Sequence, residues 1–265
     1  MLSVVLAAHN EEKNIAQCLK SVADFADEII VVDGESTDAT AEIAHNYGAR
    51  VISTTNKKNF HINKQMAMDE AKGQLVLQMD ADEAIDSQMG DWITELHQRI
   101  ELLSKSELNE FQPKAWWLRR KNHFLGKWLK KGGQYPDPVI RLYINGYAKL
   151  PQKDVHEQMS VDGEIGWAEG HLLHYPNPTF ADYLTNSVDR YSSLKADQLF
   201  DQGLKITPFS IFDYLLFKPL TTFFSLYVRH KGLVDGVPGL LFAVFSGLHF
   251  TFAYLKLWEK YENPS

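Results

Sequence analysis

Short apolar runs and longer amphipathic runs alternate through the first 103 residues of the chain. The apolar runs are rich in β-branched and aliphatic residues and are bounded by turn residues, which indicates strands. The amphipathic runs carry apolar residues three and four positions apart, which indicates helices. The expected strands are residues 2–8, 28–32, 50–54 and 74–79, and the expected helices are residues 11–23, 38–47, 60–72 and 87–103.

This alternation of strand and helix predicts an α/β fold with right-handed crossovers and a parallel sheet. In such sheets ligands bind outside the carboxyl ends of the strands. Those ends are therefore the first place to look for chemistry. The polar residues there are His9, Asn10, Glu11, Asp33, the turn at residues 54–56, Asp80, Asp82 and Glu83.

The second half of the chain has a different texture. A polar break at residues 104–113 precedes a stretch to residue 138 in which bases and tryptophans alternate with glycine and proline turns, and this predicts a small mixed sheet. The final third predicts helices at residues 181–202, 208–227 and 239–258. The last of these is near the length needed to cross a bilayer but includes His249 and Lys256. Helices lying against a membrane surface, and a helix buried in a protein core, both fit this pattern.

Composition and charge narrow the class of protein. With 265 residues, 45% of them hydrophobic and 23% charged, the chain is an ordinary globular protein. Its net charge of -7 argues against general binding to nucleic acid. The charge is unevenly distributed along the chain. Residues 111–131 hold seven basic residues and no acidic one, so the rest of the chain has a net charge of -14. This basic stretch is a solvated face, a contact for anionic phospholipid, or a site for a phosphorylated saccharide.

Two further features concern the compartment. Cys18 is the single cysteine, so an internal disulfide is excluded. The first residues lack the basic region of a secretory signal and soon become polar. A reducing cytoplasm is the expected location.

The sharpest local signal is the pair Asp80 and Asp82, which follows an apolar strand directly. Two carboxylates at this spacing suit a hard cation such as Mg²⁺ or Mn²⁺ bound together with diphosphate oxygens. The pattern is common by chance, and a solvated acidic loop is the plain alternative. For Asp33 the plain alternative is a turn or helix cap. Placement at strand ends favours ligand binding for all three.

Three motifs in this order and spacing resemble family 2 glycosyltransferases, which are inverting enzymes of the GT-A fold. Later segments are similar to the lipopolysaccharide core β-1,4-glucosyltransferase branch of that family. The resemblance implies a GT-A domain over residues 1–205, with a nucleotide-sugar half at 1–104 and an acceptor half at 105–205. It also implies an apolar, membrane-associating helical region over residues 206–265. The three motifs are residues 4–12, 30–40 and 79–83, and the later segments are residues 135–143, 155–157, 232–236 and 256–258.

The resemblance also assigns roles to residues that match the family's motifs. Asp82 is implied as the main metal ligand, which holds the ion against both phosphates of the donor. Asp80 is implied to bind ribose or metal, and Asp33 uracil or ribose. The remaining implied contacts are Asn10 and Glu11 to base and ribose, Lys64 to base or phosphate, Arg141 to the diphosphate or to the general base, and His174 to metal or phosphate.

Inverting transfer needs a general base that removes the proton of the acceptor hydroxyl. The resemblance places Glu157 in this role, with Asp154 as the alternative. The plain interpretation of Glu157 is a residue of a surface ion pair.

The implied function is metal-dependent transfer of a hexose, glucose from UDP-glucose, onto a lipid-linked saccharide such as the lipopolysaccharide inner core. The implied location is cytoplasmic and peripheral, on the inner face of the cell membrane, with no nucleic-acid partner. A haloacid-dehalogenase-like phosphatase also has Asp-x-Asp after a strand, but after its first strand, and with Thr or Val where this chain has Ala84. A third hypothesis is a membrane adaptor that binds a nucleotide-sugar without turnover.

Overall fold

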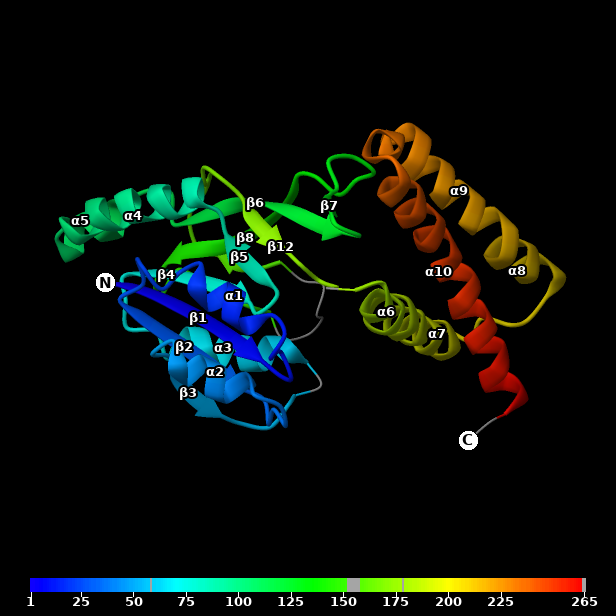
Figure 1. Ribbon diagram of the computed structural model, residues 1–265, viewed down its shortest axis with the longest axis horizontal. Coiled ribbons are helices and arrows are strands. Elements are labelled where there is room, and N and C mark those ends of the chain that lie inside the picture. The colour runs from blue at the N-terminus through cyan, green and yellow to red at the C-terminus, as the bar shows by residue number, and fades with distance from the viewer. Residues whose placement is uncertain (58, 152–157, 178, 264–265) are drawn as a thin grey trace. The chain divides into compact units, whose positions relative to one another are not determined.

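The structure, a computed structural model, describes residues 1–57, 59–151, 158–177 and 179–263. It contains two compact units (Figure 1). Unit 1 comprises Met1–Arg120 and Pro138–His174, and unit 2 comprises Lys121–Asp137 and Tyr175–Ser265. The boundaries of these two units differ from the predicted domain boundary after residue 205. That domain boundary stays a prediction.

Unit 1 is built on a parallel sheet formed by the four predicted strands. β1 (Leu2–Ala8) lies between β2 (Glu28–Asp33) and β4 (Leu75–Asp80), and β3 (Arg50–Ser53) pairs with β2 at the edge. All three pairings are parallel, which confirms the predicted α/β class. The three central strands are almost fully buried, as expected for a parallel sheet covered on both faces.

The predicted mixed sheet continues the same sheet beyond β4. β8 pairs antiparallel with β4, and the order then runs through β6 and β12 to β5, with β11 and β7 paired to β6. β6 runs from unit 1 into unit 2, where β7 pairs with its last residues, and β9 and β10 form a separate antiparallel pair. The bounds are β5 Glu83–Ile85, β6 Ala115–Phe124, β7 Lys127–Trp128, β8 Asp137–Ile144, β9 Ala148–Lys149, β10 Ser160–Val161, β11 Ile165–Trp167 and β12 Leu172–His174.

Helices cover both faces of the sheet in unit 1. Successive residues of β1 point to opposite faces, and both sets are apolar. Val4 belongs to the core that includes Leu19 of α1 and Ile93 of α4, whereas Val5 belongs to the core that includes Ala67 of α3. These two cores hold the carboxyl ends of the strands in fixed positions. The helix bounds are α1 Ile15–Lys20, α2 Thr40–Asn46, α3 Phe60–Asp69, α4 Ser87–Glu101 and α5 Lys105–Glu110.

Two local predictions were wrong. The segment expected as a polar break contains α5, which begins with a capping box between Ser104 and Glu107. The Ser-x-x-Glu pattern that forms such a box is present in the sequence. Helix α1 is shorter than residues 11–23, because the chain on both sides of it forms turns rather than regular helix.

Unit 2 is helical, as predicted for the final third. Its buried residues include Tyr214, Tyr254 and Leu257 in one cluster, and Phe124 and Tyr183 in another. Among the described residues one helix, α10, is long and apolar enough to cross a membrane. The elements are α6 Phe180–Asp182, a π-helix η1 Tyr183–Asp189, α7 Arg190–Asp201, α8 Pro208–Phe212, a π-helix η2 Asp213–Phe217, α9 Lys218–Phe224, a π-helix η3 Ser225–Arg229, a 3-10 turn η4 Gly232–Asp235 and α10 Val237–Glu262.

Candidate active site

The parallel strands bring the predicted residues of three strand ends together. Asp33, the last residue of β2, is in register with Ala8 of β1, and Asp80, the last residue of β4, is in register with Ala7. The two aspartates therefore flank the carboxyl end of β1, with Asn10 and Glu11 in the loop that follows. This is the edge at which the α/β sheet predicts a ligand.

Asp80 is held by two cations. Its Oδ1 lies 2.5 Å from Lys64 Nζ, and its Oδ2 lies 2.6 Å from Arg141 Nη2. Burial alone raises the pKa of this carboxyl, but Arg141 and Lys64 hold the pKa well below its usual range. Asp80 is thus ionised and its charge is already balanced by protein groups.

Arg141 is the centre of a wider buried network. It donates to Gln78 Oε1 at 2.5 Å and lies 3.2 Å from Glu83 Oε1, while Glu83 Oε2 accepts from the Asp80 backbone N–H at 2.9 Å. Arg120 lies 3.5 Å from the same Glu83 carboxylate. Burial lowers the pKa of Arg141, and Asp80 and Glu83 outweigh that effect and raise it. Gln78, Glu83 and Arg120 were not predicted as site residues.

Asp82 has a different environment. Its Oδ2 lies 3.3 Å from His174 Nε2, and three-quarters of its side chain is buried. His174 reaches it because β12 pairs with β5, which puts His174 opposite Glu83. The structure thus joins Asp82 to the histidine that was predicted as a further metal or phosphate contact.

Glu11 adds negative charge to this side of the site. Its pKa is raised by burial and by the nearby carboxylates of Asp82 and Asp80, against a hydrogen bond from Asn14 that lowers it. Asp82 and His174 offer a carboxylate and an imidazole, which are donors that divalent cations accept. The pair of Asp82 and His174 is therefore the part of this site whose donor chemistry fits a divalent ion.

Asn10 and its neighbours connect the first two loops. The Asn10 backbone N–H donates to Ser36 Oγ at 2.9 Å, and its side-chain Oδ1 accepts from the Thr37 backbone N–H at 2.8 Å. Its φ of 57° places it in the left-handed region that Asn tolerates. In this structure Asn10 shapes the loop, and Glu11 is fastened beside it by a 2.7 Å bond from its N–H to Thr40 Oγ1.

Two buried acceptor oxygens lie at the end of β2. Asp33 Oδ2 accepts from the Ser36 backbone N–H at 3.1 Å, but Asp33 Oδ1 has no hydrogen-bond partner among the described residues. Asn63 Oδ1 also has no hydrogen-bond partner among the described residues. The Asn63 side chain lies close to Gly34, because a Cβ added at Gly34 would come within 3.3 Å of Asn63 Nδ2. Buried polar atoms normally have partners, so these two oxygens are open to a donor from a ligand or a water molecule. Asn63 was not predicted.

The predicted general base lies outside the described residues. Glu157 and its alternative Asp154 both fall in residues 152–157. Their assignment stays a prediction from the family resemblance.

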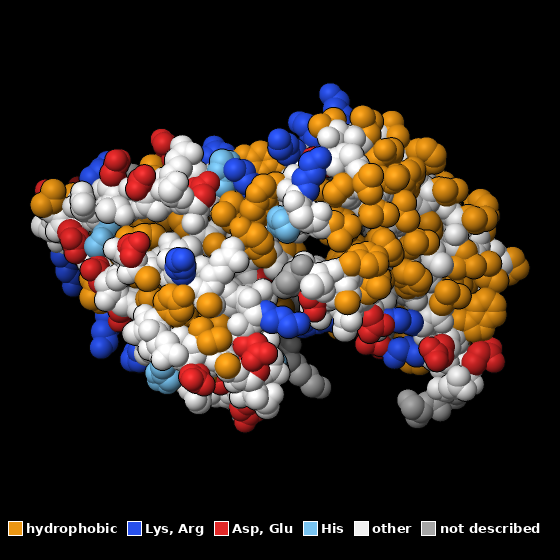
Figure 2. Space-filling model, in the orientation of Figure 1, with side chains coloured by type: hydrophobic (Ala, Val, Ile, Leu, Met, Phe, Trp, Pro, Cys, Tyr) orange, Lys and Arg blue, Asp and Glu red, His pale blue; other side chains and the backbone are white. Residues whose placement is uncertain are grey.

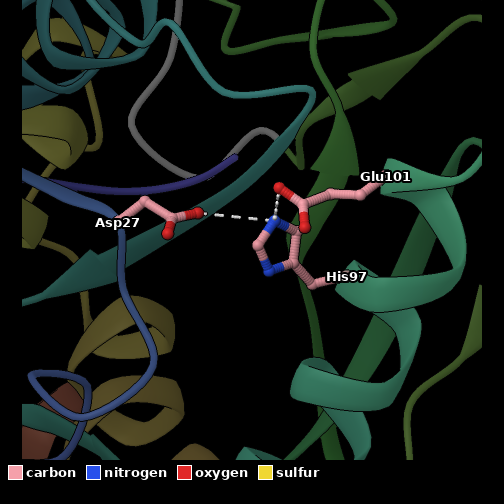
Figure 3. A group of neighbouring side chains, drawn as sticks. All are labelled: Asp27, His97 and Glu101. Carbon is pink, nitrogen blue, oxygen red and sulfur yellow. Dashed lines mark ion pairs between the residues drawn. The ribbon is translucent and has the colours of Figure 1, made fainter.

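A second group of titratable side chains lies at the opposite end of the strands. His97 Nε2 lies 3.4 Å from Asp27 and 3.2 Å from Glu101 (Figure 3). Asp27 precedes β2 and accepts from the Leu2 N–H at 2.6 Å, and the Met1 amine lies 2.7 Å from Glu101. These contacts fasten the start of the sheet to α4, away from the edge that carries Asp80 and Asp82.

Comparisons with known proteins identify proteins to which the chain is similar. The model of the glycosyl transferase family 2 matches residues 3–106. LpsC of Rhizobium meliloti (strain 1021), a lipopolysaccharide core biosynthesis glycosyltransferase, is 28% identical over 98% of this chain and 93% of its own length. The crystal structure of S. aureus TarS 1–349 in complex with UDP-GlcNAc is 18% identical, covers 98% of this chain and 89% of that one, and has a TM-score of 0.48.

A further relative covers nearly the whole molecule. An uncharacterized glycosyltransferase of Rickettsia typhi (strain ATCC VR-144 / Wilmington) is 30% identical over 91% of this chain and 82% of its own length. The family match spans the four parallel strands and the Asp80–Asp82 pair, whereas Arg141 and His174 lie beyond it. The family match and this relative show that the chain belongs to glycosyl transferase family 2, and it is a glycosyltransferase with a GT-A-like mixed α/β sheet.

Proposed function

We propose that the protein is an inverting, metal-dependent hexosyltransferase that moves glucose from UDP-glucose onto a lipid-linked saccharide of the lipopolysaccharide inner core. The observation that carries the metal dependence is the contrast between the two aspartates. Asp80 is balanced by Lys64 and Arg141, whereas Asp82 is paired with His174, whose imidazole can bind a metal. The core saccharide as acceptor is supported by similarity to LpsC, whose name describes that role. Family membership leaves no role for the phosphatase alternative.

The reaction joins the acceptor hydroxyl oxygen to the anomeric carbon as the bond from that carbon to the diphosphate oxygen breaks. Asp82 and His174 would hold the divalent ion, which when bound supplies positive charge for the departing diphosphate. Lys64 and Arg141 fix the Asp80 carboxylate at the end of β4 and keep it ionised. In this proposal the hydroxyl proton passes to Glu157, and UDP leaves with the bonding electrons.

The nucleotide end of the proposed site is formed by Asp33 and Asn63. Their buried oxygens Asp33 Oδ1 and Asn63 Oδ1 need N–H or O–H donors. Uracil offers an imide N–H and ribose offers hydroxyls. This match supports a uridine nucleotide as the donor.

We expect UDP with Mn²⁺ to raise the melting temperature of the purified protein more than GDP, CMP or ADP with the same metal. A ligand that binds only the folded state at 100 times its Kd stabilises by about 2.7 kcal/mol. The measurement is a thermal-shift panel with each nucleotide, with and without Mn²⁺. The Asp33→Asn protein should fold and lose most of the UDP shift. A larger shift with ADP would contradict the uridine donor, and no shift with any nucleotide would contradict the donor site.

We expect Glu157→Gln to lower kcat for glucose transfer by about 10²- to 10⁴-fold, because the amide does not accept the acceptor proton. UDP and Mn²⁺ should still stabilise this variant. Asp154→Asn is the matched control, and its transfer rate should stay near that of the native enzyme. If Glu157→Gln keeps the full transfer rate and Asp154→Asn loses it, the general base is Asp154 and not Glu157.

The proposed place of action is the cytoplasmic face of the inner membrane. A lipid-linked acceptor is confined to a membrane, and α10 is long and apolar enough to cross one. Unit 2 also exposes many large apolar side chains. We take these features as support for a membrane-associated enzyme.

A further inference from the structure

One face of unit 2 carries a continuous apolar stripe. The chain from Pro208 to Arg229 is helical throughout, through α8, η2, α9 and η3. Six large apolar side chains along it, spaced three or four residues apart, are each 52% to 79% exposed. In an α-helix of 3.6 residues per turn, side chains four residues apart move gradually around the helix axis. The π-helical segments η2 and η3 have more residues per turn, so they move the side chains back and keep them on one side. The stripe consists of Phe209, Phe212, Leu216, Leu220, Phe224 and Val228.

The stripe is the outer side of this helical segment. The inner side packs against α10, as shown by the cluster of Tyr214 with Tyr254 and Leu257, and α10 in turn packs against α7. Figure 2 shows hydrophobic side chains gathered over α8, α9 and α10. Apolar patches of this extent on a protein surface mark an interaction site.

A cluster of cations lies at one end of the stripe. The loop after β7 packs on the turn before α10, because Gly132 N–H donates to His230 O at 2.9 Å. Asp235, 1% exposed, accepts from the N–H groups of Lys130 at 3.0 Å and Lys131 at 2.8 Å. Asp235 is also the only acidic residue between Lys218 and Trp258. The exposed cations, termed here the basic turn, are Lys127, Lys130, Lys131, Arg229 and Lys231.

Apolar residues stand among these cations. Leu233, Val234 and Val237 are 52% to 66% exposed in the same turn. Exposed cations beside exposed apolar side chains match the boundary between lipid headgroups and acyl chains. The charge is complementary to anionic phospholipid, and the apolar side chains are complementary to acyl chains.

We propose that unit 2 docks on a bilayer containing anionic phospholipid, with the apolar stripe in the interface and the basic turn on the headgroups. The stripe, about 28 Å long at 1.5 Å per residue, lies parallel to the membrane. A perpendicular insertion would carry into the hydrocarbon the ion pairs Asp189–Lys256, 2.5 Å, and Asp197–Lys260, 2.7 Å, which join α7 and the segment before it to α10. This inference rests on the membrane location given in the proposed function, but binding to the bilayer does not depend on sugar transfer.

The test is flotation of the full chain with vesicles, without nucleotide or sugar. The vesicles are phosphatidylcholine alone, or a mixture with phosphatidylglycerol at three to one, in low and high salt. We expect the anionic lipid to strengthen binding at least about tenfold at low salt, and we expect high salt to remove that gain. Equal binding to both vesicle types at low salt would overturn the role of the basic turn.

Two variants separate the two parts of the surface. K130E/K131E/K231E should bind both vesicle types about equally, because it removes the gain of at least about tenfold that anionic lipid gives the native chain. F212S/L216S/L220S should bind neither vesicle type. Matched controls are K20E/K72E/K105E, three exposed lysines of unit 1, and Leu102→Ser, an exposed apolar residue there; both should bind as the native chain does.

Folding of each variant is checked by its melting temperature and circular dichroism. A stripe variant that folds and still floats with vesicles would overturn the proposal. So would a native chain that fails to float and instead forms a dimer that F212S/L216S/L220S dissociates, because a second copy would then cover the stripe. Either failure leaves the nucleotide panel, which contains no lipid, to decide the transfer function separately.

Discussion

Replacing Asp82 with asparagine is expected to lower glucose transfer by about 10²- to 10³-fold while leaving the protein folded. The amide removes the negative ligand that is paired with His174. The Asp82 carboxylate has one ion pair given by the structure, at 3.3 Å to His174, so little folding energy depends on it. The measurement is kcat with saturating Mn²⁺, beside the melting temperature with and without Mn²⁺.

The matched control for this variant is Asp91→Asn, because Asp91 is an exposed aspartate on α4. It has the same change of charge and should leave transfer and the Mn²⁺ shift unchanged. An Asp82→Asn enzyme that keeps its Mn²⁺ shift and its transfer rate would remove Asp82 from the metal site.

Asp80→Asn is expected to destabilise the protein by about 3 kcal/mol at pH 7. The substitution leaves the buried cations of Lys64 and Arg141 without their shared counter-charge, and breaking a buried pair from one side typically costs about 3 to 5 kcal/mol. A value at the lower end is expected because a quarter of the Asp80 side chain is exposed and Glu83 still faces Arg141. The measurement is the free energy of unfolding in urea, followed by circular dichroism.

The pH dependence of stability and a second substitution test whether the charge balance between Asp80 and the cations Lys64 and Arg141 causes this loss. The depressed pKa of Asp80 contributes stability above the unfolded pKa of about 3.9, and that contribution falls by about 1.4 kcal/mol per pH unit below it. The difference between native and Asp80→Asn proteins should therefore narrow as the pH falls below about 4. Lys64→Met combined with Asp80→Asn should recover part of the loss. A constant difference from pH 7 to pH 3, or no recovery, would show that this charge balance is not the cause.

The sequence predicted the frame of unit 1 because its central strands are buried on both faces. Such strands are short continuous apolar runs, and β1 from Leu2 to Ala8 was predicted to the residue. Their parallel order then placed Asp33 and Asp80 at one edge without any knowledge of contacts. Helix ends were less predictable, since turns beside α1 have the same apolar spacing as the helix itself.

The pairing of charges within the site was beyond sequence patterns. Arg141 lies 61 residues from Asp80 in the chain, and only the antiparallel pairing of β8 with β4 brings them together. His174 reaches Asp82 for a similar reason, through β12 and β5. No sequence pattern pointed to Asn63. Its role follows from its Oδ1 atom, which is buried without a hydrogen-bond partner among the described residues, and this can be known only from the structure. Glu83 did carry a signal, as a third acid directly after the Asp80–Asp82 pair.

The most direct test of the account is glucose transfer itself, followed by NMR with ¹³C-labelled UDP-glucose, Mn²⁺ and a lipopolysaccharide core acceptor. The account predicts release of UDP, a product in which the α-linked glucose of the donor has become β-linked, and loss of both on removal of the metal. An α-linked product would contradict inversion. Transfer at an unchanged rate without any divalent ion would contradict the role given to Asp82 and His174.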